Sequence, residues 1–211
     1  MRLAVQSYLP PLTGTSLREM NLLRSVNSLR SVRKRSLTIP PTGLATSTPQ
    51  ALTGLSAEPA APPLLRKDFV IDPYQICEAR IAGADVVLLI AAALTVPQCA
   101  ELAAFAAALG LEVLLEVHNE AELDHISDHV DVVGVNNRNL GTFITDTGVS
   151  KRLAGLLPRD IVRISESGVS TPETVRELRA VGYRGFLMGE NFMKRTDPAA
   201  ALGEFINELQ R

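Results

Sequence analysis

The sequence predicts an α/β fold, a TIM-type (β/α)8 barrel in which six βα units are recognisable and the first two are absent or aberrant. From Leu64 onward, short apolar runs alternate with helix-length amphipathic segments at the spacing of one βα unit. The runs are continuously apolar, which is typical of parallel strands covered on both faces. With 211 residues, the chain is shorter than the roughly 250 residues of a complete barrel. The first question is therefore whether the chain contains all eight βα units of a barrel.

Six apolar runs are the expected strands of this barrel. They are Leu64–Leu65 leading into Lys67, Val86–Ile90, Val113–Val117, Val132–Val135, Ile161–Ile164 and Phe186–Met188. Helix-start signals lie between them: Asp72-Pro73, Thr95-Val96-Pro97, and Ser170-Thr171-Pro172-Glu173 with the spacing of a capping box. An open doubly wound sheet alternates in the same way, but the Gly-rich dinucleotide fingerprint is absent after the first run. A closed barrel is therefore favoured.

Residues 1–61 are predicted to be an aberrant N-terminal segment, and residues 62–211 the barrel portion. Residues 1–64 contain seven Lys and Arg and two acids, whereas residues 65–211 contain fourteen and twenty-one. Eight of the thirteen prolines also lie in the first segment, so most of it is predicted to be irregular, with one basic amphipathic helix near residues 17–32. These features are also typical of an organellar transit peptide. Cleavage near residue 60 would, however, leave a chain that starts partway through the repeat.

Composition argues against several other classes of protein. A net charge of −2 lacks the basic excess that nucleic-acid binding needs, and no apolar run is long enough to span a membrane. Cys77 and Cys99 have no ligand at metal spacing, so we expect reduced helix residues in a cytoplasmic protein. His118, His125 and His129 lie on one predicted helical stretch and its flanks, and we expect solvated surface side chains and no metal site.

Polar residues cluster at the ends of five expected strands. In a barrel the carboxyl ends of the strands converge on one mouth, so these side chains are expected to meet. A lysine there is expected to have a lowered pKa and to pair with a glutamate as acid and base. The glycines after the last two strands are placed to bind phosphate through backbone amides. The residues are Lys67, Glu116, Asn136, Arg138, Glu166, Ser167, Gly168, Gly189 and Glu190.

Several of these residues lie in motifs that resemble one enzyme family, indole-3-glycerol-phosphate synthase. The resemblance runs from about residue 62 to the C-terminus, and its most specific motifs are LRKDF at 65–69 and NNRNL at 136–140. It is supported by Leu115-Glu116-Val117-His118, Ser165-Glu166-Ser167-Gly168 and Met188-Gly189-Glu190.

The resemblance implies a carboxy-lyase of tryptophan biosynthesis that closes the indole ring of 1-(2-carboxyphenylamino)-1-deoxyribulose 5-phosphate. Carbon dioxide and water are lost, and no cofactor is needed. Carried over by motif, Lys67 is the general acid and Glu116 handles protons in the dehydration. Asn136, Arg138 and Glu166 bind the substrate, and Ser167, Gly168, Gly189 and Glu190 line the phosphate site. The implied partner is thus a phosphorylated small molecule.

The N-terminal segment departs from the family. The first-strand pattern E-x-K-x-x-S-P-S is missing, and residues 32–38 are only its nearest match; the second-strand pattern S-V-L-T is missing as well. Loss of that lysine and glutamate predicts turnover near background. A non-catalytic barrel fragment with a residual phosphate site, able to associate through its exposed edges, is therefore the alternative. Phosphoribosylanthranilate isomerase, another phosphosugar barrel, is a weaker alternative because it lacks LRKDF and NNRNL.

Overall fold

A computed structural model describes residues 2–4 and 63–211 of the chain. Its strands are β1 (Arg2–Ala4), β2 (Leu65–Arg66), β3 (Val86–Ile90), β4 (Glu112–Val117), β5 (Val132–Asn136), β6 (Val162–Glu166) and β7 (Gly185–Leu187). The helices are α1 (Pro73–Ile81), α2 (Val96–Ala108), α3 (Gly148–Leu153), α4 (Pro172–Ala180), α5 (Glu190–Met193) and α6 (Pro198–Gln210). Two short 3₁₀ helices, η2 (Ala91–Ala93) and η3 (Glu120–His125), follow β3 and β4.

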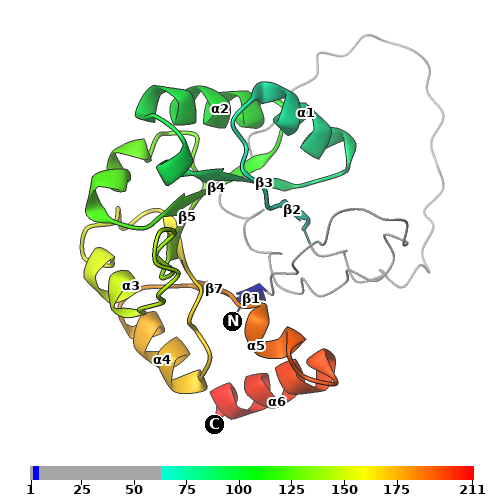
Figure 1. Cartoon of the computed structure of the whole chain (residues 1–211), viewed down its shortest axis with the longest axis vertical. Helices are drawn as coiled ribbons and strands as arrows, with labels where there is room; N and C mark the ends of the chain where they lie inside the picture. Colours follow the sequence, from blue (N-terminus) through cyan, green and yellow to red (C-terminus); the bar gives the residue numbers. More distant parts are fainter. Residues whose placement is uncertain (1, 5–62) are drawn as a thin grey trace, which may run out of the picture.

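The strands form one parallel sheet with the order β1-β7-β6-β5-β4-β3-β2. Figure 1 shows the sheet curving like part of a barrel wall, with α1 to α4 along its convex side. The six expected strands are all present among the described residues, which confirms the α/β class and gives the curved parallel wall of a TIM barrel. Within the described residues β1 and β2 are the two edges of the sheet.

Strand β1 lies within residues 1–61, where the sequence predicted no specific strand. Its backbone pairs in parallel with β7, with Arg2 opposite Gly185 and Ala4 opposite Leu187. The helix expected near residues 17–32 lies outside the described residues, and the division of the chain at residue 61 stays a prediction.

Apolar side chains cover both faces of the sheet, because successive residues of a strand point to opposite faces. In β3, Val87 and Leu89 belong to the large core between the sheet and the outer helices. Val86, Leu88 and Ile90 belong to a smaller inner cluster with Leu114, Val132 and Leu187. The continuous apolar runs in the sequence thus reflect burial on both sides.

Helix starts follow the sequence signals with one correction. Asp72 and Thr95 cap α1 and α2 in full capping boxes with Gln75 and Gln98. The box expected between Ser170 and Glu173 is not formed. Thr171 is the cap of α4 instead, and its side chain accepts from the Thr174 N–H. Pro172, whose fixed φ suits the first helical position, places the cap one residue later than expected.

The C-terminal helices close the end of the sheet near β7. Gly189 is the N-cap of α5, and α6 packs against both α4 and α5. The rings of Phe192 and Phe205 join α5 to α6 in an edge-to-face contact at 5.5 Å. This packing fixes the loop that follows β7, which carries two of the residues expected to bind phosphate.

Candidate active site

Acidic and amide side chains stand at the carboxyl ends of β4, β5 and β6, on the inner face of the sheet. Glu116 follows the inner-face Leu114 by two residues, and Asn136 lies four residues after Val132 on the same face of β5. Asn136 is paired in register with Glu166. Because side chains on one face recur every second residue, the alternation that buries the inner cluster also aims these groups into one space.

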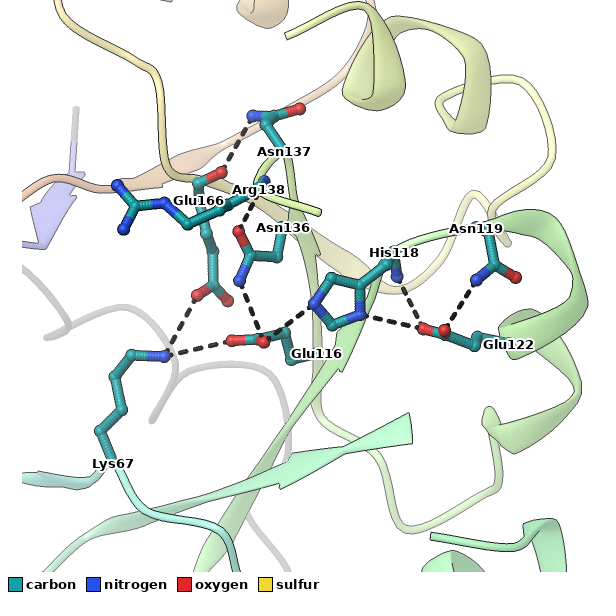
Figure 2. Close-up of polar contacts among 9 residues, drawn as sticks. All are labelled: Lys67, Glu116, His118, Asn119, Glu122, Asn136, Asn137, Arg138 and Glu166. Carbon is teal, nitrogen blue, oxygen red and sulfur yellow. Dashed lines mark hydrogen bonds and ion pairs between the residues drawn. The ribbon is translucent and has the colours of Figure 1, made fainter. Parts of the chain in front are cut away.

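Lys67, directly after β2, joins the carboxylates of β4 and β6. Its Nζ donates to Glu116 Oε2 at 3.1 Å and lies 3.5 Å from Glu166 Oε2. Asn136 Nδ2 donates to Glu116 Oε1 at 3.0 Å. Glu116 and Glu166 are buried, whereas the Lys67 side chain is 22% exposed. Figure 2 shows these side chains converging on Glu116.

Gly134 makes room for Glu166. A Cβ added at Gly134 would lie 2.1 Å from Glu166 Oε1 and 3.1 Å from its Cδ. Among the described residues this Oε1 has no hydrogen-bond partner. The Glu166 carboxyl therefore packs against the backbone of Gly134, where any side chain would collide with it.

The two carboxyl groups have opposite pKa shifts. Burial raises the pKa of Glu116, but His118, Lys67 and Asn136 outweigh burial and lower that pKa to about 2. Burial raises the pKa of Glu166 to about 8, helped by the neighbouring Glu116 charge and opposed by Lys67. Glu116 accepts from several donors and Glu166 from few, so at neutral pH Glu116 is ionised and Glu166 holds a proton.

The expectation of a lowered lysine pKa is wrong. Burial does lower the pKa of Lys67, but the charges of Glu166 and Glu116 outweigh burial and raise it. Lys67 is therefore charged at neutral pH because two carboxyl groups surround it.

The expectation of surface histidines is wrong for His118 and His125. The His118 side chain is 11% exposed and lies between Glu116 and Glu122. His125 is buried, and its ring nitrogens lie 2.9 Å from Leu94 O and 3.1 Å from Glu122 O. His125 is the last residue of the 3₁₀ helix η3, whereas His118 directly follows β4. In residues 63–211 no group of three or more His, Cys, Asp or Glu side chains is arranged to hold a metal ion.

A second feature of the site is a pocket of about 370 Å³ beside the ends of β6 and β7. Three of the residues expected to bind phosphate line it: Gly168, Gly189 and Glu190. Ser167, the fourth, is not among the described residues that line it. Lys194 and Arg195 also line the pocket, and neither was expected there from the sequence. They were detectable as two cations within six residues of Gly189.

The turn at the end of β6 is held from behind by Asn137. Ser167 and Gly168 have φ values of 62° and 69°, and a Cβ at Gly168 would lie 2.4 Å from Thr145 Cγ2. Asn137 Nδ2 donates to Glu166 O at 2.9 Å and Ser167 O at 3.0 Å. Two backbone carbonyls of the turn are thereby fixed from a buried side chain.

The Arg138 side chain reaches Glu190, which lines the pocket, whereas its backbone N–H donates to Asn136 Oδ1 at 3.0 Å. Its guanidinium donates to Glu190 Oε2 at 3.1 Å, and Glu190 also pairs with Lys194. Lys194 and then Arg138 lower the pKa of the exposed Glu190 carboxyl. The carboxylate of Glu190 thus forms ion pairs with Arg138 and Lys194, two cations that could otherwise bind an anion in the pocket.

Fold and site together define a TIM-barrel protein with an acid and base cluster at the carboxyl ends of its strands, next to a glycine-lined pocket. A sequence profile of the indole-3-glycerol phosphate synthase family matches residues 51–205, and the chain belongs to this family. It is 57% identical over 148 residues to the indole-3-glycerol phosphate synthase of Bacteroides thetaiotaomicron. That match covers 70% of this chain and 57% of the relative.

Further relatives have the same name and are matched over a similar extent. The indole-3-glycerol phosphate synthase of Salinibacter ruber is 52% identical over 141 residues, which are 66% of this chain and 52% of the relative. The chain therefore spans little more than half the length of the curated relatives it matches.

Solved structures support the fold alone. KGPDC from Streptococcus mutans superposes with a TM-score of 0.52 at 15% identity, covering 67% of this chain and 68% of that one. A mutant tryptophan synthase α-subunit from Pyrococcus furiosus gives a TM-score of 0.51 at 21% identity, covering 65% and 59%.

No helix within residues 63–211 combines the length and apolar character needed to cross a membrane.

Proposed function

We propose that this chain carries the ring-closing site of an indole-3-glycerol-phosphate synthase. The observation that carries the proposal is the position of the Lys67 ammonium between the Glu116 and Glu166 carboxyl groups, at the carboxyl ends of β2, β4 and β6. In a TIM barrel this end is where catalytic groups from different strands meet. The substrate is 1-(2-carboxyphenylamino)-1-deoxyribulose 5-phosphate, and the products are indole-3-glycerol phosphate, carbon dioxide and water.

In this proposal the proton chemistry is divided between Lys67 and Glu116. The Lys67 ammonium protonates the substrate carbonyl as the ring carbon attacks it and the carboxylate leaves as carbon dioxide. After Lys67 has regained a proton from water, it protonates the hydroxyl that leaves as water. The ionised Glu116 carboxylate accepts a proton in the dehydration, which its low pKa and its fixed donors permit. Protonated Glu166 can donate a hydrogen bond to a sugar hydroxyl. Asn136 orients Glu116 directly, and Arg138 orients the substrate.

The substrate phosphate is assigned to the pocket beside β6 and β7. Gly168, Gly189 and Lys194 line that pocket. Backbone N–H groups and cations are the usual partners of a phosphate in barrels of this type. A cytoplasmic location and association through the sheet edges stay predictions of the sequence.

The test compares turnover with phosphate binding in the same chain. Purified protein is incubated with the substrate, indole fluorescence is followed, and the product is verified by mass spectrometry, with Lys67→Ala as the inactive reference. Because the first-strand lysine and glutamate pattern is missing, we expect slow turnover, near background. In parallel, the amide signals of Gly168 and Gly189 are followed by NMR as inorganic phosphate is added, with Gly155 and Gly203 as controls.

The outcomes separate the two candidate functions. Turnover that is lost in Lys67→Ala supports the synthase. Phosphate binding at Gly168 and Gly189 without any turnover supports a non-catalytic barrel fragment with a residual phosphate site. If neither is found, the proposed site is wrong.

A further inference from the structure

His118 is held between two carboxylates from different elements. Its Nδ1 lies 3.1 Å from Glu122 Oε2 in η3, and its Nε2 lies 3.3 Å from Glu116 Oε1 in β4. The backbone N–H of His118 also donates to Glu122 Oε2 at 2.7 Å. Asn119 Nδ2 donates to the other Glu122 oxygen at 2.7 Å. Glu122 is therefore tied down on both oxygens, and it fixes the imidazole in turn (Figure 2).

The imidazole approaches Glu116 on a side that Lys67 does not reach. Lys67 binds Oε2 of Glu116, whereas Asn136 and His118 meet Oε1. The Nε2 contact is an ion pair by distance and is not aligned as a hydrogen bond. His118 therefore acts on Glu116 mainly through its positive charge. The second carboxylate, Glu122, stabilises that charge from the other side of the ring.

The charged groups around the ring favour its cationic form. Those that face it or its partners are Glu116 from β4, Glu122 from η3, Lys67 after β2 and Glu166 from β6. Burial lowers the pKa of His118, but the neighbouring carboxylates of Glu116 and Glu122 outweigh burial and raise it to about 9. With Glu166 protonated, two cations balance two anions, so the cluster carries no uncompensated buried charge.

We propose that His118, held by Glu122, is a positioning residue for Glu116: it fixes the orientation of that carboxylate and keeps it ionised. The inference rests on the proposed function, which gives Glu116 its proton-accepting role. No contact of His118 with the substrate is needed. Proton acceptance would therefore depend on a pair of residues, His118 and Glu122, that do not themselves react.

The test uses NMR titration of side chains in the whole chain, which needs no turnover. His118→Gln keeps an amide donor near Glu116 but removes the positive charge, and Glu122→Gln removes the anion behind the ring. Glu120→Gln is the matched control, because Glu120 is an exposed glutamate in the same 3₁₀ helix. The carboxyl carbon of Glu116 and the imidazole carbons of His118 are followed from acid to alkaline pH.

We expect the pKa of Glu116 to rise by about one unit or more in His118→Gln, and that of His118 to fall by a similar amount in Glu122→Gln. Glu120→Gln should change neither. Where ring closure is measurable, His118→Gln should lower kcat roughly 10-fold with little change in KM, since a misplaced reacting group slows chemistry rather than binding.

Two results would overturn the proposal. One is a His118 that titrates at or below its ordinary pKa of 6.5 in the unmodified chain. The other is an unchanged Glu116 pKa in a folded His118→Gln. If His118→Gln does not fold, the His118 titration in Glu122→Gln decides alone. The expected pKa shifts without turnover in any variant would support the positioning contact and count against the proposed synthase activity.

Discussion

The lysine and carboxylate cluster and the glycine-lined pocket lie at the same end of one sheet and differ in almost every physical property. In the cluster, Glu116 and Glu166 are buried, and fixed partners surround Glu116. In the pocket, the charged side chains are exposed, and Glu190 pairs with both Arg138 and Lys194. One region is enclosed and its charges are balanced, whereas the other is open and its cations hold an exposed carboxylate.

This difference suits the two regions to different tasks. A buried cluster can shift pKa values, because burial and close charges act with little screening by water. An open pocket shifts pKa values only weakly, but a bound anion can replace the Glu190 carboxylate there. The difference supports the proposed division, with proton transfer at the ends of β2, β4 and β6 and anion binding at the ends of β6 and β7.

The largest effect is expected from removing the shared cation of the cluster. Lys67→Met leaves Glu116 and Glu166 facing one another without their lysine, so we expect a loss of roughly 3 kcal/mol in the free energy of unfolding at pH 8. Any ring closure should fall to background. Lys151→Met is the matched control, because Lys151 pairs with Glu177 at 2.8 Å on the exposed surface. Urea unfolding measures both, and equal losses would contradict the proposed difference between the regions.

Gly134→Ala should have the next largest effect. The added methyl group would collide with the Glu166 carboxyl, and we expect a loss of about 1–3 kcal/mol in the free energy of unfolding, as for overpacked cores. Gly203→Ala is the control, since open space surrounds this exposed helical glycine and alanine favours the helix. A Gly134→Ala protein as stable as the unmodified chain would show that Glu166 can leave its place freely.

The pH dependence of stability should reveal the buried cluster. Glu166 has a raised pKa in the folded chain, so its favourable contribution is lost as pH rises from about 4.5 towards about 8. His118 also has a raised pKa, so its contribution is complete below about 6.5 and is lost as pH rises through about 9. We expect stability to fall by a few kcal/mol for each of these groups, since one pKa unit is about 1.4 kcal/mol and the pKa values move from 4.5 to about 8 and from 6.5 to about 9.

Glu166→Gln separates the two contributions to this pH dependence. The amide imitates the protonated acid and does not titrate, so the part of the fall between about pH 4.5 and 8 should disappear and the part near pH 9 should remain. Thermal unfolding at a series of pH values measures both. A flat profile in the unmodified chain would argue against a proton on Glu166 at neutral pH.

The smallest effect is expected at the pocket. Glu190→Gln frees Arg138 and Lys194 from their exposed carboxylate, so inorganic phosphate should bind roughly 2- to 5-fold more tightly, in proportion to the small worth of exposed ion pairs. Glu177→Gln removes a comparable exposed carboxylate on α4 and should leave phosphate affinity unchanged. Weaker phosphate binding in Glu190→Gln would show that Glu190 shapes the pocket rather than competing for its cations.

The strand repeat and the main residues of the candidate site could be predicted from the sequence. Continuous apolar runs predicted six strands because a sheet covered on both faces needs apolar side chains at every position. Lys67, Glu116, Asn136 and Glu166 could be expected together because parallel strands bring their carboxyl ends to one edge. These features depend on the local pattern of apolar residues and on strand direction, and both can be inferred from residues that are close together in the sequence.

The charge states and the supporting contacts could not be predicted, because they depend on how the chain folds. The lysine pKa was expected to fall, and it rises because Glu166 approaches from a strand 99 residues further along the chain. His118 was expected at the surface, although its place two residues after Glu116 was a usable signal for a shared strand face. The strand β1 could not be predicted from the sequence pattern, because three residues are too few to show one. Its hydrogen bonds to β7 define it as a strand. Burial, pKa and strand pairing depend on neighbours distant in sequence, so only the folded chain sets them.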